Sequence, residues 1–187
     1  MSTHEPASPG SRIILQPTDM CWITGSENDG FDQCAHGGVV FTVDAIPFVG
    51  GSDAEGMTVS AAALFLLRTL THDHTAARPV AESSQLFPCC GHTAYPIDGR
   101  FPVLVMGCDV GIDVDVTHSA GSVHLRGQDG TEATVTATEW RDAVVGFVDA
   151  VQAFYDAAPP RQPLGDDFED EGWRAFWKEW GERRAAA

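Results

Sequence analysis

Positive charge is the first thing this sequence lacks. Its 187 residues include 27 Asp and Glu against 11 Lys and Arg, which gives a formal net charge of −16, and Lys178 is the only lysine. Phosphate backbones and anionic lipids require a basic face, so the composition argues against direct binding to nucleic acid or to a membrane surface. The acidity suits a basic protein partner, and a compositional bias of the proteome explains it equally well.

Long apolar runs are also missing, and we expect no leader peptide. The longest apolar run, residues 61–67, is far shorter than the ~20 residues that cross a bilayer. Residues 1–11 show no basic patch followed by an apolar run, so we expect a disordered lead and a cytoplasmic protein. In a reducing compartment, cysteines that cluster with histidines favour a metal or a catalytic thiol over a disulfide framework.

Known catalytic signatures do not occur either. The chain has no phosphate-binding glycine loop with lysine, no G-x-S-x-G turn and no H-E-x-x-H helix. A nucleotide-driven enzyme, a serine hydrolase of the strand–turn–helix type and a zinc protease of that motif are therefore disfavoured.

The length suits one domain with a proper core. We predict an α+β fold with a mostly antiparallel sheet, one buried helix and two C-terminal amphipathic helices. The domain covers residues 12–157, a proline-rich linker covers 158–168, and an aromatic helix over 169–187 packs on the domain.

Residue patterns place the individual elements. Runs rich in β-branched residues, with glycine and proline between them, predict strands over residues 12–15, 39–46, 102–106, 112–117, 122–126 and 131–137, the first two ended by Pro17 and Pro47. A segment that is apolar on all sides predicts a buried helix over residues 61–71, with Thr58 or Ser60 as its cap. Apolar residues at helical spacing from Trp140 predict a second helix over residues 139–157.

Cysteine and histidine gather in two short turns and one strand end. The candidate ligands for a metal ion are Cys34, His36, Cys89, Cys90, His92 and Cys108. Zinc prefers thiolate and imidazole ligands in pairs held by tight turns, so this pattern predicts a structural zinc ion. The spacing departs from the paired C-x-x-C pattern of zinc fingers.

Two other interpretations of these residues stay open. Free cysteine is among the most buried residue types, so the cysteines can be ordinary core residues. Alternatively, a cysteine serves as a redox or catalytic thiol with His36 or His92 as its base.

The last helix carries an aromatic stripe. Trp173, Phe176, Trp177 and Trp180 follow each other at helical spacing and form one face. Such a face usually closes a core, and tryptophan also anchors many protein interfaces, so we consider these residues as a candidate partner-binding surface. Two further groups are expected to be solvated: the polar helix exit at residues 72–74, and Asp113 and Asp115 on the wet face of a strand.

Several of these motifs together resemble a known pattern. Trp22–Gly25, Cys34–Gly37, Val59–Leu67, Pro88–His92, Gly107–Cys108, Gly111–Asp113 and Phe176–Trp180 stand in this order. From about residue 20 onward the chain resembles a family of small, uncharacterised bacterial proteins, for which no activity is established, so the resemblance implies no catalytic residue. By size and acidity it also looks like immunity proteins that neutralise secreted toxins, which is an analogy rather than a motif match.

Two functional hypotheses follow from the sequence. The first is a non-enzymatic cytoplasmic interaction module of the immunity or inhibitor type, which binds a protein partner such as a basic toxin and is stabilised by zinc. The alternative is a zinc-dependent enzyme, in which three of the Cys/His ligands hold the metal and the fourth position is open to water.

Overall fold

The computed structural model describes residues 12–23, 30–50, 56–81, 85–89, 93–108 and 110–187. It confirms the predicted α+β class, with three helices and antiparallel strand pairing throughout the described ranges. The predicted disordered lead, residues 1–11, lies outside these ranges. None of the helices in the described part of the chain has the length and apolar character that a membrane-spanning helix requires.

The first sheet is built around strand β2 (His36–Val43). It pairs with β1 (Ile13–Cys21) on one side and with β3 (Ile46–Val49) on the other, and its start also pairs with β4 (Met57–Thr58). The prediction that Pro17 ends the first strand is wrong, because Pro17 sits within β1 opposite Val39. A proline is tolerated there because β1 has only one neighbour in the sheet and needs no N–H on its free side.

The second predicted strand is in fact a hairpin. Strands β2 and β3 are joined by Asp44 and Ala45, which both have positive φ. Two consecutive left-handed residues make the tight turn whose twist matches that of paired strands. Sequence patterns missed this turn because glycine or asparagine usually marks it, and neither occurs here.

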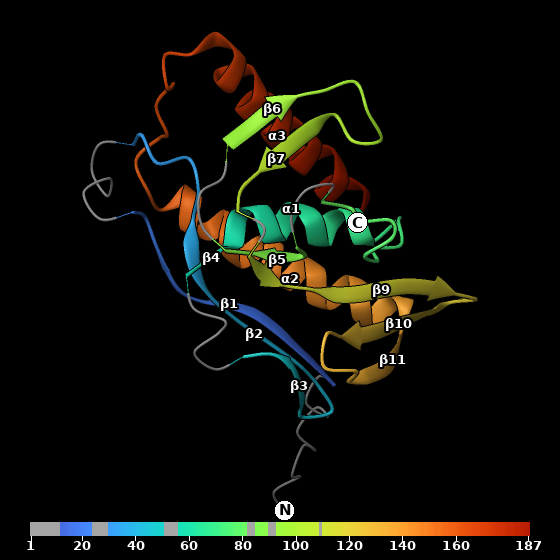
Figure 1. The fold of residues 1–187 in the computed structure, drawn as a ribbon. Coiled ribbons are helices and arrows are strands. Elements are labelled where there is room, and N and C mark those ends of the chain that lie inside the picture. The colour runs from blue at the N-terminus through green and yellow to red at the C-terminus, as the bar shows by residue number, and fades with distance from the viewer. Residues whose placement is uncertain (1–11, 24–29, 51–55, 82–84, 90–92, 109) are drawn as a thin grey trace, which may run out of the picture.

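Helix α1 (Val59–Thr69) is the centre of the molecule. All of its eleven residues are buried, as the apolar run predicted, and it contacts α2, α3, β2 and β5 (Phe87–Pro88). In Figure 1 it crosses the middle of the molecule, with α2 (Ala137–Asp156) behind it. Each large apolar side chain that α1 removes from water contributes about 1.5–3 kcal/mol to the free energy of unfolding.

Three smaller antiparallel groups complete the sheet structure. Strand β5 pairs with β8 (Gly111–Ile112), and β6 (Thr93–Pro96) forms a hairpin with β7 (Val103–Met106). The meander of β9 (Val114–Ser119), β10 (Ser122–Gly127) and β11 (Glu132–Thr136) agrees with the prediction to within a few residues. A Cβ on Gly111 would overlap the carbonyl of Phe87, so only glycine allows β5 and β8 to approach this closely.

The helix after this meander begins two residues earlier than predicted. Thr136 caps α2 by accepting a hydrogen bond from the backbone N–H of Glu139, whose carboxylate in turn accepts one from the N–H of Thr136. This reciprocal capping box satisfies two of the free N–H groups at the helix start. One face of α2 is buried, and the indole N–H of Trp140 on that face donates to Thr69 of α1.

The last helix, α3 (Asp167–Ala186), packs on the hairpin β6–β7 and on α1. Asp166 caps it by accepting hydrogen bonds from the N–H groups of Phe168 and Glu169. Gly172 lies against β6, and a Cβ at this position would overlap the backbone carbonyl of Ala94. The close approach of α3 to the hairpin therefore depends on glycine.

A buried ion pair joins α3 to α1. The guanidinium of Arg68 donates two hydrogen bonds to the carboxylate of Glu179, 2.9 and 2.7 Å long, and both side chains are almost fully buried. Arg68 also donates to the carbonyls of Val80 and Val103 and lies 4.1 Å from the ring centroid of Phe101. One side chain thus connects α1, the segment before β5, β7 and α3.

Removal of the Glu179 charge is expected to destabilise the fold strongly. Glu179→Gln leaves Arg68 as a buried cation without its counter-charge, and breaking such a pair costs about 3–5 kcal/mol. Urea unfolding followed by tryptophan fluorescence measures the change. Glu182→Gln, an exposed residue on the same helix with the same change of charge, is the control and should shift the free energy of unfolding by less than about 0.5 kcal/mol. Equal stability of the two variants would contradict the central role of the pair.

Gly172→Ala and Gly181→Ala form a second matched pair, because both glycines lie within α3. The first introduces a clash with the β6 backbone, whereas no atom lies within 4 Å of a Cβ at Gly181. Alanine favours a helix over glycine by up to about 1 kcal/mol. We therefore expect a lower melting temperature for Gly172→Ala and an equal or higher one for Gly181→Ala, and a rise for both would refute the packing described here.

Candidate functional site

The segment of residues 30–36, here called the Cys34 loop, is held by several hydrogen bonds from distant parts of the chain. It leads into β2 and carries two of the six predicted metal ligands, Cys34 and His36, which are both buried. Residues from four other parts of the chain hold it in place. Many interactions therefore fix the position of this short loop.

Asp32 organises the inside of this loop. Its carboxylate accepts hydrogen bonds from the backbone N–H groups of Ile23 and Cys34, at 2.7 and 3.0 Å, and lies 3.4 Å from Nε2 of His36. Burial opposes ionisation of Asp32, but the contacts with His36 and with the two N–H groups outweigh it, so the pKa of Asp32 is lowered. The contact between Nε2 and the carboxylate lacks hydrogen-bond geometry, so we describe it as an electrostatic contact.

Tyr155 of α2 fixes the loop from the other side. Its hydroxyl donates to the carbonyl of Gln33 at 2.7 Å and accepts from the N–H of Ala35 at 3.0 Å. The hydroxyl of Ser60, in the first turn of α1, accepts from the same N–H at 3.2 Å. Burial raises the pKa of Tyr155, and the nearby Cys34 raises it further, so the phenol keeps the proton that it donates.

The linker between α2 and α3 closes over the loop. The N–H of Gln162 donates to the carbonyl of Gly30, and the side chain of Gln33 donates to the carbonyl of Gln162. The guanidinium of Arg161 stacks on the ring of Trp22, with 3.9 Å between the Cζ atom and the ring centroid. The predicted linker is thus pinned to the domain by at least three contacts.

A groove of about 450 Å³ opens where the Cys34 loop, the linker and α3 meet, here called the linker groove. Its size falls within the range of small-molecule sites. The indole N–H of Trp173, which is only 5% exposed, has no hydrogen-bond acceptor among the described residues. Such an unsatisfied buried donor costs about 1–3 kcal/mol. The residues that line the groove are Gln33, Arg161, Gln162, Pro163, Asp170, Trp173, Arg174 and Trp177.

The Cys34 loop and the turn that begins at Cys89 are neighbours on either side of Thr58. His36 pairs with Thr58 across the strands, and the Thr58 hydroxyl donates to the carbonyl of Cys89 at 2.6 Å. Thr58 precedes the first residue of α1, but its side chain makes no capping bond to the helix. Its hydroxyl instead joins the two cysteine-bearing segments.

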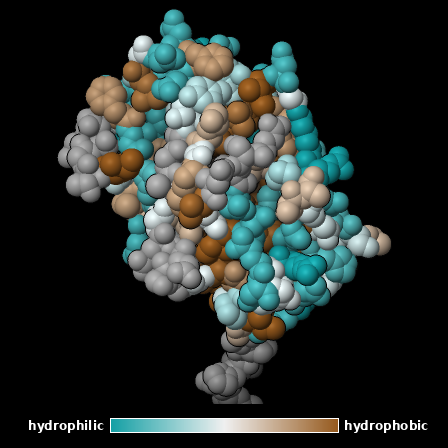
Figure 2. Space-filling model, in the orientation of Figure 1, coloured by the Kyte–Doolittle hydropathy of each residue, from teal (hydrophilic) through white to brown (hydrophobic). Residues whose placement is uncertain are grey.

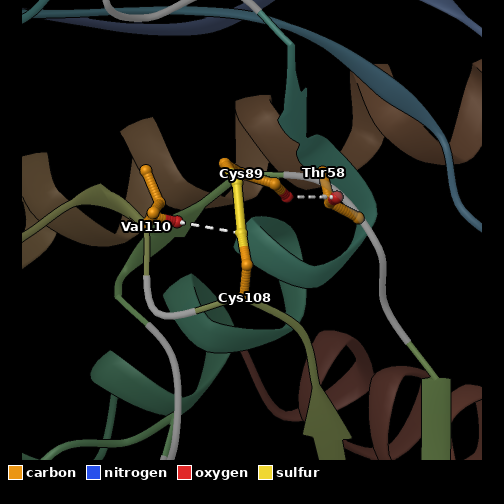
Figure 3. Close-up of a disulfide and its surroundings, with 4 residues drawn as sticks. All are labelled: Thr58, Cys89, Cys108 and Val110. Carbon is orange, nitrogen blue, oxygen red and sulfur yellow. Dashed lines mark hydrogen bonds between the residues drawn. A yellow bond between two sulfur atoms is a disulfide. The ribbon is translucent and has the colours of Figure 1, made fainter.

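Cys89 and Cys108 form a disulfide, contrary to the expectation that metal or thiol chemistry would take precedence over disulfides (Figure 3). Strands β5 and β8 and the bond from the N–H of Cys89 to the carbonyl of Val110 bring the two Cα atoms to 6.7 Å. The Cys108 sulfur also lies 3.8 Å from the Val110 carbonyl oxygen. Because a disulfide sulfur carries no proton, this approach is a contact and not a hydrogen bond.

The six predicted metal ligands are therefore divided. The disulfide withdraws Cys89 and Cys108 from thiolate coordination, which corrects their predicted role in this oxidised form. Cys90 and His92 lie outside the described residues. Within the described ranges no group of three His, Cys, Asp or Glu side chains is placed to hold a metal ion. A zinc site, whether structural or catalytic, stays a prediction.

The aromatic stripe of α3 is an internal surface, which corrects its proposed role as a partner-binding face. Trp173, Phe176 and Trp180 are buried, and only Trp177 is half-exposed. The ring of Trp177 meets that of Tyr155 edge to face, with 4.7 Å between the centroids. The amphipathic face closes the core, because α1 and the β6–β7 hairpin leave apolar surface that only α3 covers.

His74, expected to be solvated, is buried and pairs with Asp113, which is half-buried. Nε2 of His74 lies 2.7 Å from the Asp113 carboxylate, and its Nδ1 accepts from the N–H of Val80 at 3.0 Å. The imidazole therefore donates through Nε2. Burial opposes ionisation of Asp113, and the bond to His74 together with backbone N–H groups outweighs it, so the pKa of Asp113 is lowered. The pair pins the segment that follows α1 to the start of β9.

Sequence reasoning missed several residues that build the site. Asp32 lies four residues before His36, which is a local signal that spacing could have revealed. Tyr155, Arg161 and Gln162 are more than 100 residues away from the loop that they contact. Their roles follow only from the way α2 and the linker return to the Cys34 loop.

Comparison of the chain with protein-family models, with curated proteins and with solved structures finds no match. The resemblance to a bacterial family stays a prediction, and the function has to be argued from the molecule itself.

The state of the cysteines is directly testable. Alkylation of the native protein without reductant should label the exposed Cys21 quickly and the buried Cys34 slowly, and peptide mapping should recover Cys89 linked to Cys108. Cys108→Ser should lower the free energy of unfolding by about 3 kcal/mol, the value expected for a cross-link that closes a loop of this length. Cys21→Ser is the control and should leave stability unchanged. Recovery of all five cysteines as reactive thiols would contradict the disulfide.

Proposed function

We propose that the protein is a non-enzymatic interaction module of the immunity or inhibitor type that binds a basic protein partner. The observation that carries the proposal is that most of the few basic side chains form ion pairs within the protein itself. Six of the eleven basic side chains form ion pairs with carboxylates of the same chain: Arg12, Arg68, Arg126, Arg141, Arg183 and Arg184. Most carboxylates of the described residues have no such partner and leave the exterior acidic.

The acidity is concentrated at the start of α3. Residues 166–171 include five carboxylates, and neither Asp167 nor Glu171 has a basic partner among the described residues. Phe168, in the same stretch, is 54% exposed and stacks on Tyr95 of β6 at 5.4 Å. Acidic groups around exposed aromatic rings suit lysine and arginine side chains of a partner, by charge attraction and by cation–π contact.

The distribution of apolar groups is consistent with a charge-guided encounter. Figure 2 shows hydrophilic residues over much of one face, with hydrophobic residues scattered between them. Such a surface supports fast, salt-sensitive association more than a large apolar interface.

The proposal is tested in two steps. Affinity capture at low salt from a lysate of the source organism should recover a basic protein, whose association rate is then measured with purified components. We expect the rate to fall at least about tenfold between low and high salt, because charge steering is screened. Asp167→Asn with Glu171→Gln should slow association more than Asp98→Asn with Glu182→Gln, a control pair of exposed carboxylates with the same change of charge.

Two outcomes would refute the proposal. One is the absence of any protein partner at low salt, and the other is an association rate that is insensitive to both salt and the α3 variants.

A further inference from the structure

The linker groove differs in charge from the rest of this acidic protein. Two arginines that form no ion pair with the described residues, Arg161 and Arg174, line it together. In the described part of the chain, neither guanidinium has a carboxylate within 4 Å. Two unneutralised cations beside one cavity favour an anionic occupant.

Arg161 is already held in a fixed position. It stacks on Trp22, donates from Nε and one terminal nitrogen to the carbonyl of Pro159, and donates from the other terminal nitrogen to the carbonyl of Asp32. These contacts use three of its five N–H groups, so two remain for a ligand. A guanidinium that is fixed before binding loses little side-chain entropy when a ligand arrives.

Arg174 lies on α3 and is more exposed. Its Nε donates to the carbonyl of Asp170, one turn earlier in the helix, which leaves both terminal nitrogens unused by any described residue. Asp170 itself lines the groove, but its two carboxylate oxygens accept hydrogen bonds from the N–H groups of Leu164 and Gly165. The one acidic side chain among the described residues that line the groove is thus bonded to the backbone of the linker.

Two tryptophans, Trp173 and Trp177, form the aromatic wall of the groove. Trp173 lines the groove, is 95% buried, and has no hydrogen-bond acceptor for Nε1 among the described residues. Because Nε1 has almost no accessible surface, a ligand in the groove contacts the Trp173 ring and not this N–H. The Trp177 ring, half-buried beside it, offers a flat apolar wall.

From this combination we infer that the linker groove binds a small organic carboxylate with a flat apolar body. The carboxylate accepts hydrogen bonds from the unused N–H groups of Arg161 and Arg174, while the apolar body lies against the rings of Trp173 and Trp177. A groove of about 450 Å³ suits a ligand of this size. The inference is independent of the acidic surface at the start of α3 and stands whether or not a basic protein partner exists.

The experiment uses phenylacetate as the probe and the five tryptophans as reporters. The indole N–H groups of the five tryptophans give separate signals in a ¹H–¹⁵N correlation spectrum, which single Trp→Phe variants assign. Phenylacetate should shift the Trp173 signal in a saturable way and leave that of Trp140, buried at the other side of α1, unchanged. Phenylacetamide, the neutral isostere, should bind at least about tenfold more weakly, because a charged acceptor bonds guanidinium more strongly.

Two variants on the exposed face of α3 distinguish the effect of a charge beside the groove from the effect of the net charge of the protein. Arg174→Gln should weaken phenylacetate binding about tenfold, whereas Lys178→Gln, one turn further along the same helix with the same change of charge, should leave it unchanged. Both residues are exposed, so neither change should affect folding.

Three results would overturn the inference. The first is the absence of a Trp173 shift at any phenylacetate concentration, and the second is an equal response to phenethylamine, which carries the opposite charge. The third is a peptide with a C-terminal phenylalanine that binds more than about tenfold tighter than phenylacetate, because the occupant would then be a polypeptide end. None of these results bears on the salt-sensitive capture of a basic partner.

Discussion

The ion pair between Arg68 and Glu179 is the constraint on which the arrangement of this protein depends. A buried guanidinium is tolerated only with a counter-charge and full hydrogen bonding. Glu179 can supply the counter-charge and two of the hydrogen bonds only when α3 lies across α1. The same guanidinium bonds the carbonyls of Val80 and Val103, so the segment before β5 and the strand β7 are positioned together with α3. Once α3 is in place, its aromatic face packs against the core.

The candidate site is a consequence of this docking. The linker that leads into α3 lies over the Cys34 loop, where Gln162 donates to the carbonyl of Gly30 and Arg161 to that of Asp32. The loop is thereby closed between α1, α2 and the linker, and the linker groove forms at the junction. The polar groups of this region come from segments far apart in sequence, and each has its geometry set by a neighbour rather than by its own local conformation.

The start of α3 is acidic, whereas the linker groove beside it is lined by two arginines. The outer start of α3 collects carboxylates without basic partners, which supports binding to a basic protein. The groove beside it keeps two guanidiniums apart from those carboxylates, because Asp170 is bonded to the N–H groups of Leu164 and Gly165. Local bonding therefore allows a cationic pocket within a protein whose net charge is −16.

Much of the fold could be read from the sequence alone. Helical spacing and all-round apolarity determined α1, α2 and α3, and turn residues determined the β9–β11 meander, because burial of one face imposes these periods locally. Local pattern could not reveal the β2–β3 turn at Asp44 and Ala45, the passage of β1 through Pro17, or the burial of His74 beside Asp113, since each depends on a partner from elsewhere. The sequence singled out the cysteines and histidines by type, but only the tertiary structure decided that Cys89 pairs with Cys108 and that Asp32, Tyr155 and Arg161 surround Cys34. The physical reason is that bond partners are chosen by distance in space, and chain packing sets that distance for residues that can be 129 positions apart in the sequence.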